Sequence, residues 1–157
     1  MMNVIDVAGY FIKNSKIVLS KGRLNKLIYL ADWKNCLDNN EQLTDIQWKF
    51  NHYGPYVDEI QDTIENDSEK RIVITDKTNY FGSVKYELSI KKDDFILPTQ
   101  QQKKVLDLIL QITDNLNWSD FINLVYSTYP IKVSIRGEIM NLVKLSKEYK
   151  DKKHNAK

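Results

Sequence analysis

One apolar helix constrains the fold of this chain more than any other segment. Its apolar positions form two neighbouring stripes at helical spacing: Leu24, Leu27, Ile28 and Ala31 in the first, and Leu30, Trp33 and Leu37 in the second. Because two adjacent stripes must be covered from more than one side, we expect this helix at the centre of the core. Ser20 is suited to its N-cap, and Asp38-Asn39-Asn40 to its end.

The segment before this helix predicts a shorter helix. Its apolar residues Val4, Val7, Ala8 and Phe11 share one face, and the pattern stops near Asn14. Gly9 lies inside this helix, where glycine lowers helix stability. We therefore expect Gly9 to permit close packing against another element.

Alternating and hinge patterns follow the central helix. Residues 46–51 alternate between apolar and polar side chains, which predicts a short, half-buried strand. Gly54 then fits an N-cap and Pro55 a first helical position, with Asp58-Glu59 favouring the positive end of the helix dipole. Residues 71–90 have a period of two around a polar tip, Asp76 to Asn79 with Gly82, and predict a β-hairpin. Together the three strands would form a small antiparallel sheet.

The C-terminal half predicts three more helices. Thr99 to Gln102 has a capping-box pattern, and Asn117 with Asp120 begins a second helix that ends before Pro130. Ile135, Ile139, Leu142 and Val143 predict the last one. We expect an α+β, mostly helical single domain over residues 1–147, followed by a basic, flexible tail at 148–157.

Composition agrees with one globular domain. The 157 residues are 42% hydrophobic and 28% charged, which is enough apolar surface to form a core without metals or disulfides. The single cysteine, Cys36, excludes a disulfide framework and is expected to be an apolar filler. No membrane span or signal peptide is predicted, and we expect a cytoplasmic protein.

Charge gives no strong nucleic-acid signal. The net charge is only +2, and the local excess lies in Lys147–Lys157, which holds five lysines. Such a tail is typical of a solvated chain end, and the alternative is an arm that binds phosphates. Nucleic acid is therefore not the expected partner.

Motifs for catalysis are missing from the sequence. It has no glycine-rich phosphate loop, no HExxH, no CxxC and no Gly-x-Ser-x-Gly, so we expect no enzyme, no cofactor and no metal site. His52 is the one plausible imidazole for acid–base chemistry, and a structural hydrogen-bonding role is favoured over it.

Aromatic residues concentrate near the two proline turns. Trp48, His52, Tyr53 and Tyr56 lie within nine positions, and Tyr126 and Tyr129 precede Pro130. Two interpretations are open: the turns pack on one another in the core, or exposed members bind a partner. The residues proposed for partner binding are Trp48, His52, Tyr53, Tyr56 and Tyr129.

Four motifs in order resemble a known family. They are Val7-Ala8-Gly9-Tyr10, the run from Lys26 to Trp33, the run from His52 to Val57, and the run from Val125 to Pro130. Over roughly residues 4–145, the chain resembles the Panacea domain, also called the SocA-like antitoxin domain. The motif positions that carry over look mainly fold-defining: Lys26, Leu27, Tyr29, Ala31, Gly54, Pro55, Tyr126 and Pro130. Lys26 has a second interpretation, a lysine whose stem packs while its ammonium reaches solvent.

The resemblance implies an antitoxin of a toxin–antitoxin pair, bacterial or prophage-encoded, that neutralises its toxin by direct contact. One branch of the family delivers its toxin to a protease. Many relatives carry an additional DNA-binding segment. We do not expect one here, because the first predicted helix already belongs to the domain pattern. Two rival hypotheses remain: a nucleic-acid-binding regulator that uses the hairpin and the basic tail, and an enzyme that uses His52. An inhibitor of host defence is a close relative of the antitoxin hypothesis.

Overall fold

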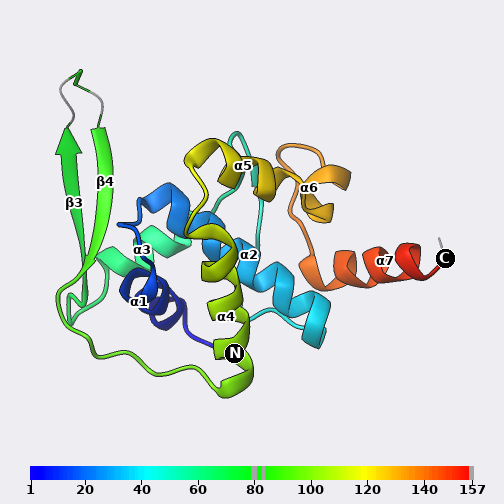
Figure 1. Cartoon of the computed structure of the whole chain (residues 1–157), viewed down its shortest axis with the longest axis horizontal. Helices are drawn as coiled ribbons and strands as arrows, with labels where there is room; N and C mark the ends of the chain where they lie inside the picture. The colour runs from blue at the N-terminus through cyan, green and yellow to red at the C-terminus, as the bar shows by residue number, and fades with distance from the viewer. Residues whose placement is uncertain (79–80, 83, 156–157) are drawn as a thin grey trace.

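The central helix of the fold is α2 (Lys21–Asn39), around which the other elements pack (Figure 1). The computed structural model describes residues 1–78, 81–82 and 84–155. The helix begins as predicted, because the Ser20 hydroxyl accepts a hydrogen bond from the Arg23 N–H at 3.2 Å. It ends where Asn40 takes the left-handed conformation, with φ of 61°.

The remaining helices surround α2 on several sides. Within the described residues they are α1 (Val4–Asn14), α3 (Glu59–Glu65), α4 (Gln100–Thr113), α5 (Trp118–Tyr126), α6 (Tyr129–Val133) and α7 (Leu142–Asn155). The predicted capping box opens α4, and the Asn117 side chain caps α5. The predicted α+β single domain, mostly helical, is confirmed.

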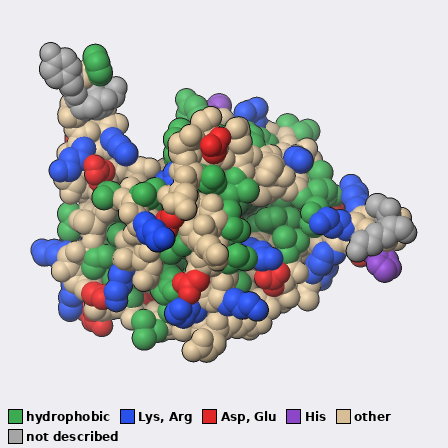
Figure 2. Space-filling view, in the orientation of Figure 1, with side chains coloured by type: hydrophobic (Ala, Val, Ile, Leu, Met, Phe, Trp, Pro, Cys, Tyr) green, Lys and Arg blue, Asp and Glu red, His purple; other side chains and the backbone are tan. Residues whose placement is uncertain are grey.

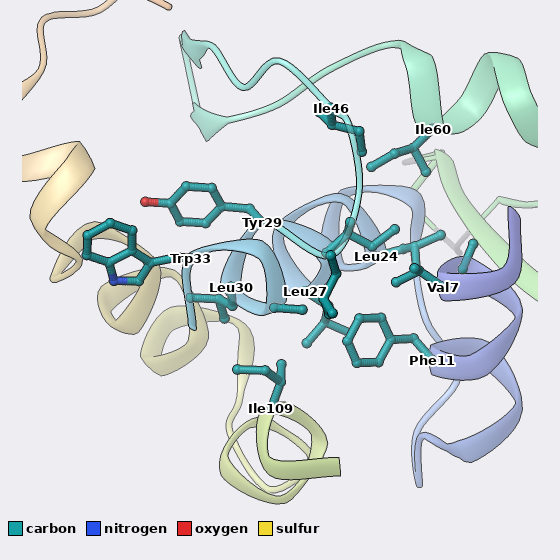
Figure 3. Close-up of a cluster of buried hydrophobic side chains, with 14 of the residues drawn as sticks. Val7, Phe11, Leu24, Leu27, Tyr29, Leu30, Trp33, Ile46, Ile60 and Ile109 are labelled. Carbon is teal, nitrogen blue, oxygen red and sulfur yellow. The ribbon is translucent and has the colours of Figure 1, made fainter. Parts of the chain in front are cut away.

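The core fills the space between α2 and these neighbours (Figure 3). Leu27 of α2 meets Phe11 of α1 on one side, and Ile109 of α4 lies below Leu30. All these side chains are buried, which removes apolar surface from water on several faces of one helix. The predicted central position of this helix is thus observed.

Gly9 of α1 permits the close packing predicted for it. A Cβ atom at this position would lie 2.6 Å from the Phe95 ring, closer than real Cβ contacts allow. Phe95 belongs to the extended segment that returns from the hairpin to α4. Glycine is therefore required here by contact with a ring and not by backbone conformation.

The predicted hairpin is formed by β3 (Ile72–Thr78) and β4 (Val84–Ile90). The hairpin projects from the helical body (Figure 1). Its register runs from Ile72 opposite Ile90 to Thr78 opposite Val84. Of the predicted tip, Asp76 to Thr78 belong to β3, and residue 79 lies outside the described residues. The base of the hairpin is attached to the entry of α2, because the Leu88 N–H donates to the Leu19 carbonyl at 2.9 Å.

The predicted three-stranded sheet is wrong. Residues 46–50 alternate between buried and exposed as expected, but this segment does not pair with the hairpin. Its partners come from the segment before α7: the Phe50 N–H donates to the Glu138 carbonyl, and the Met140 N–H donates to the Trp48 carbonyl. Beyond it, β1 (Phe50–Asn51) pairs only with β2 (Gly54–Pro55), in a separate two-stranded ribbon.

The predicted helix start at Gly54-Pro55 is also wrong. Both residues form β2, and α3 begins later, at Glu59. Gly54 has φ of 98°, which favours glycine, and a Cβ atom there would lie 3.3 Å from the Tyr126 ring. The sequence signal thus marked a tight turn beneath an aromatic ring, not a helix cap.

The C-terminal helix differs from its prediction at both ends. Ile135 and Ile139 are exposed in the segment between α6 and α7, because α7 begins only at Leu142. The helix then continues to Asn155, so residues 148–155 of the predicted tail are helical. Tyr149 of this part packs against Trp33, with ring centroids 6.0 Å apart.

Asp32 is the polar centre of the core. Its fully buried carboxylate accepts hydrogen bonds from the Thr44 N–H at 2.9 Å, the Thr44 hydroxyl at 2.6 Å and the Trp48 indole N–H at 2.8 Å. Gln42 adds a fourth donor at 3.3 Å. One side chain of α2 therefore holds the whole segment that leads to β1.

Replacing Asp32 with alanine should destabilise the protein strongly. The change leaves the Trp48 and Thr44 donors buried without an acceptor, and we expect the free energy of unfolding at pH 7 to fall by about 3 kcal/mol. Urea denaturation measures this difference. Asp38→Ala is the control on the same helix, since Asp38 is partly exposed in an ion pair with Lys34. An equal loss in both variants would contradict the role of Asp32.

The same pair of proteins should show a defined pH dependence. Burial raises the pKa of Asp32 from 3.8 to about 6, although its hydrogen bonds act in the opposite direction. The part of the stability that depends on protonation of Asp32 is therefore complete below about pH 4 and is lost as pH rises through about 6. The part that comes from the hydrogen bonds of Thr44 and Trp48 to the carboxylate remains at pH 7. The advantage of wild type over Asp32→Ala should shrink across this range in urea denaturation. If the stability advantage of wild type grows with pH instead, the hydrogen bonds from Thr44 and Trp48 lower the pKa of Asp32 by more than burial raises it.

Candidate functional site

A pocket of about 400 Å³ opens beside the first turns of α2. We call it the Lys26 pocket. Its walls come from α2, from the β1–β2 ribbon and the residues after it, and from the start of α5. The lining residues are Gly22, Lys26, Asn51, His52, Tyr53, Tyr56 and Trp118.

The wall that contains Trp118 is positioned by Arg23. This buried guanidinium donates from Nη2 to the Thr113 carbonyl at 2.6 Å and to the Leu116 carbonyl at 3.1 Å. It therefore fastens the corner between α4 and α5 to α2. The Trp118 ring then lies over Gly22, where an added Cβ atom would be 3.6 Å from the ring.

The opposite wall is positioned by Asn25. Its side-chain amide donates to the Val57 carbonyl at 2.8 Å, and its oxygen accepts from the Val57 N–H at 3.1 Å. This pair of bonds imitates a strand pairing and fixes the backbone next to Tyr56. At the ribbon turn, the His52 carbonyl accepts a hydrogen bond from Arg136, and the Tyr53 side chain is 83% exposed.

Lys26 supplies the charge of the pocket. The residue is only 3% exposed, and its Nζ lies 6.0 Å from the centroid of the Tyr56 ring. Burial lowers the pKa of Lys26. Within the described part of the chain, its ammonium forms no ion pair and no hydrogen bond. The pocket therefore combines aromatic walls with one cation that lacks a counterion.

Three of the five residues predicted to bind a partner meet in this pocket: His52, Tyr53 and Tyr56. Trp48 is wrong as a surface anchor, because its side chain is fully buried and donates to Asp32. Its position in the alternating segment directs it inward.

Tyr129 lies elsewhere, at the contact between α6 and α7. Its ring packs on Tyr149 at 5.3 Å, and the Lys152 Nζ lies 5.2 Å from its centroid. Figure 2 shows hydrophobic side chains gathered in the area bounded by α5, α6 and α7, with Lys and Arg side chains toward the C-terminal end of α7. The structure therefore separates Tyr129 from the pocket residues.

The family-motif positions are mostly buried. Leu27, Tyr29, Ala31, Gly54, Pro55 and Pro130 all lie inside, and Tyr126 is half-buried on Gly54. The Tyr29 hydroxyl is hydrogen-bonded to the Thr128 hydroxyl at 2.7 Å, which joins α2 to the second proline turn. Lys26 differs from the others because it also lines a pocket. The alternative of a packed stem with an ammonium that reaches solvent agrees with the structure, because the residue is only 3% exposed and yet no described side-chain nitrogen is both buried and without a hydrogen-bond partner. The solvent that the ammonium reaches is that of the pocket.

Gly22, Asn51 and Trp118 were missed by sequence reasoning. Trp118 gave one usable signal: it lies outside the apolar face of α5, which is formed by Phe121, Leu124 and Val125. A large aromatic side chain off the buried face is a candidate for binding. Gly22 and Asn51 gave no comparable signal.

The described residues contain neither a candidate metal site nor a candidate membrane-spanning helix. Among them, no group of three or more His, Cys, Asp or Glu side chains is placed to hold a metal ion. No described helix combines the length and the apolar character needed to span a bilayer.

Removing the charge of Lys26 should stabilise the protein. Methionine has a similar length and needs no counterion, so we expect Lys26→Met to raise the free energy of unfolding at pH 7 by about 1 kcal/mol. Urea denaturation measures the change. Lys34→Met on the same helix is the control, because Lys34 is partly exposed and paired with Asp38. If Lys26→Met lowers the free energy of unfolding more than Lys34→Met does, the Lys26 ammonium already has favourable interactions in the isolated protein.

The comparisons with known proteins find one match. The family model described as antitoxin SocA-like, Panacea domain, matches residues 24–130. This span contains every residue of the Lys26 pocket except Gly22. No curated protein and no solved structure matches the chain. Because the model covers more than half of the sequence, the chain belongs to the SocA-like, Panacea-domain antitoxin family.

Proposed function

We propose that this chain is an antitoxin that neutralises a partner toxin by direct protein contact, through the Lys26 pocket and its rim. Family membership supports the antitoxin role. The observation that carries the location is the exposure of two aromatic side chains at this pocket. Tyr53 is 83% exposed, and Trp118 is 51% exposed.

Exposed aromatic side chains on a fixed frame are effective interface anchors. They bury a large apolar area while losing little conformational entropy, and binding hot spots are enriched in Tyr and Trp. Here the frame is fixed by hydrogen bonds: Arg23 holds the corner before Trp118, and Asn25 holds the backbone after Tyr56. The rim therefore needs little rearrangement before it binds a partner.

The family also supports a non-enzymatic role. Masking of the toxin requires one contact surface, which the pocket and its rim supply. Delivery of the toxin to a protease would require a second surface in addition. We propose masking as the mechanism, with protease delivery as its testable extension.

The proposal predicts rescue of growth and a stable complex. We would express the small open reading frame adjacent to this one, with and without this chain, and then co-purify the two proteins. Wild type should restore growth, and the double variant Tyr53→Ala with Trp118→Ala should lose rescue and weaken binding at least tenfold, since both anchors are removed.

The control is Leu97→Ala, which removes an apolar side chain that is 79% exposed, close to the exposure of Tyr53, on the segment before α4. It should rescue growth like wild type. Full rescue by the Tyr53/Trp118 variant would place the contact surface elsewhere. Absence of both toxicity and a complex would contradict the antitoxin function itself. A fall in toxin level that depends on a protease would show delivery rather than masking.

A further inference from the structure

Lys26 is the exception among the buried polar residues of α2. These residues are Arg23, Asn25, Lys26, Asp32 and Asn35. Arg23, Asn25, Asp32 and Asn35 each have hydrogen-bond partners from other parts of the chain. Among the described residues, Lys26 has no hydrogen bond and no ion pair, and its Nζ lies 6.0 Å from the centroid of the Tyr56 ring.

An unpaired cation in this position is costly by itself. The Nζ atom keeps contact with solvent through the pocket, since no described side-chain nitrogen is both buried and without a hydrogen-bond partner. The weak contact with one ring compensates only part of the hydration that the ammonium loses at this largely buried position. The remaining acceptor can come from outside the molecule, because the pocket is open and Lys26 lines it. A ligand with one negative charge would match the single charge of Lys26.

The walls of the pocket restrict what can carry that negative charge. They include Trp118, Tyr53 and Tyr56, which present aromatic faces, while Asn51 adds an amide. The volume of about 400 Å³ is larger than a carboxylate requires, so an apolar group can enter with it. Phosphate groups favour guanidinium forks and several donors, which a single ammonium does not supply.

We propose that the Lys26 pocket receives an acidic side chain, Asp or Glu, together with the neighbouring apolar residue on a surface segment of a partner protein. The ammonium of Lys26 pairs with the carboxylate, and the Trp118 and Tyr53 rings cover the apolar residue. A protein is the favoured source because both rings extend beyond the pocket into solvent. The identification of this partner as the toxin rests on the proposed function. The preference of the pocket for an acidic side chain is independent of that function.

The first test uses a blocked peptide as the probe. Acetyl-Ser-Gly-Glu-Phe-Gly-Ser-amide and its Gln counterpart would be titrated into the ¹⁵N-labelled protein, following the three tryptophan indole signals. We expect the acidic peptide to shift the Trp118 signal with at least tenfold higher affinity than the Gln peptide. Trp33 and Trp48 are buried and serve as internal references. Equal affinity for both peptides, or no shift with either, would overturn the proposal.

Variants separate the charge from the shape of the pocket. Lys26→Met should bind the Glu and Gln peptides with equal, low affinity, because the preference for acid resides in the ammonium. Lys21→Met is the matched control on the same helix, since Lys21 lies outside this pocket, bonded to Gln61. It should keep the tenfold preference. Retention of the preference in Lys26→Met would overturn the assignment to Lys26.

Two further arms distinguish other sources of negative charge. Inorganic phosphate or a single-stranded oligonucleotide that shifts Trp118 at lower concentration than the Glu peptide would overturn the acidic-peptide proposal. A peptide that lacks Glu but has a free C-terminal carboxylate would be tested in the same way. Tighter binding of this peptide than of the blocked Glu peptide would also overturn the proposal.

The growth assay keeps this inference distinct from the proposed function. If Lys26→Met neutralises the toxin as well as wild type does, the ammonium has no role in contacting the toxin. The proposed antitoxin function would be unaffected by that result. Failure of wild type to neutralise any toxin would refute that function, while peptide binding would still support the pocket chemistry. Loss of rescue in Lys26→Met, with rescue kept in Lys21→Met, supports both.

Discussion

The fold depends on one constraint: a helix buried on nearly every side carries polar side chains that must find partners in the interior. Each partner of α2 comes from a different segment. Asp32 binds the Thr44–Trp48 segment, Asn25 binds Val57, and Arg23 binds the corner between α4 and α5. Because an unsatisfied buried polar group costs more than a hydrogen bond contributes, these bonds act mainly by excluding other arrangements of the loops.

The candidate site follows from the same constraint. The bonds of Arg23 and Asn25 fix the walls of the Lys26 pocket. Lys26, the next residue along the helix, has no hydrogen-bond acceptor among the described residues. The interior thus builds a rigid aromatic frame and places an unpaired ammonium within it. Such a residue lowers stability in the isolated protein and gains its partner on binding, which is a recognised compromise between stability and function.

Local sequence signals predicted the elements well and their partners poorly. The capping box at Thr99, the N-cap at Asn117 and the hairpin at 71–90 depend on short-range bonds and were confirmed. The third strand was predicted correctly in its alternation of burial but assigned to the wrong partner, since its bonds go to residues 137–140. Pairing between distant segments is decided by the packing of the whole chain, which alternation does not encode.

The sequence by itself determined the central helix, the helical α+β class and the family. It also singled out Lys26 and the His52–Tyr56 turn as candidates. Periodicity and capping residues suffice for the helix and the fold class because they act within a few residues, whereas the family follows from the resemblance of four motifs in order. Tertiary structure alone decided that Trp48 turns inward, that Tyr129 lies apart, and that Trp118 joins Lys26 across more than ninety positions of sequence. The physical reason is that burial and charge compensation depend on which distant segments meet, and only the packed chain brings them together.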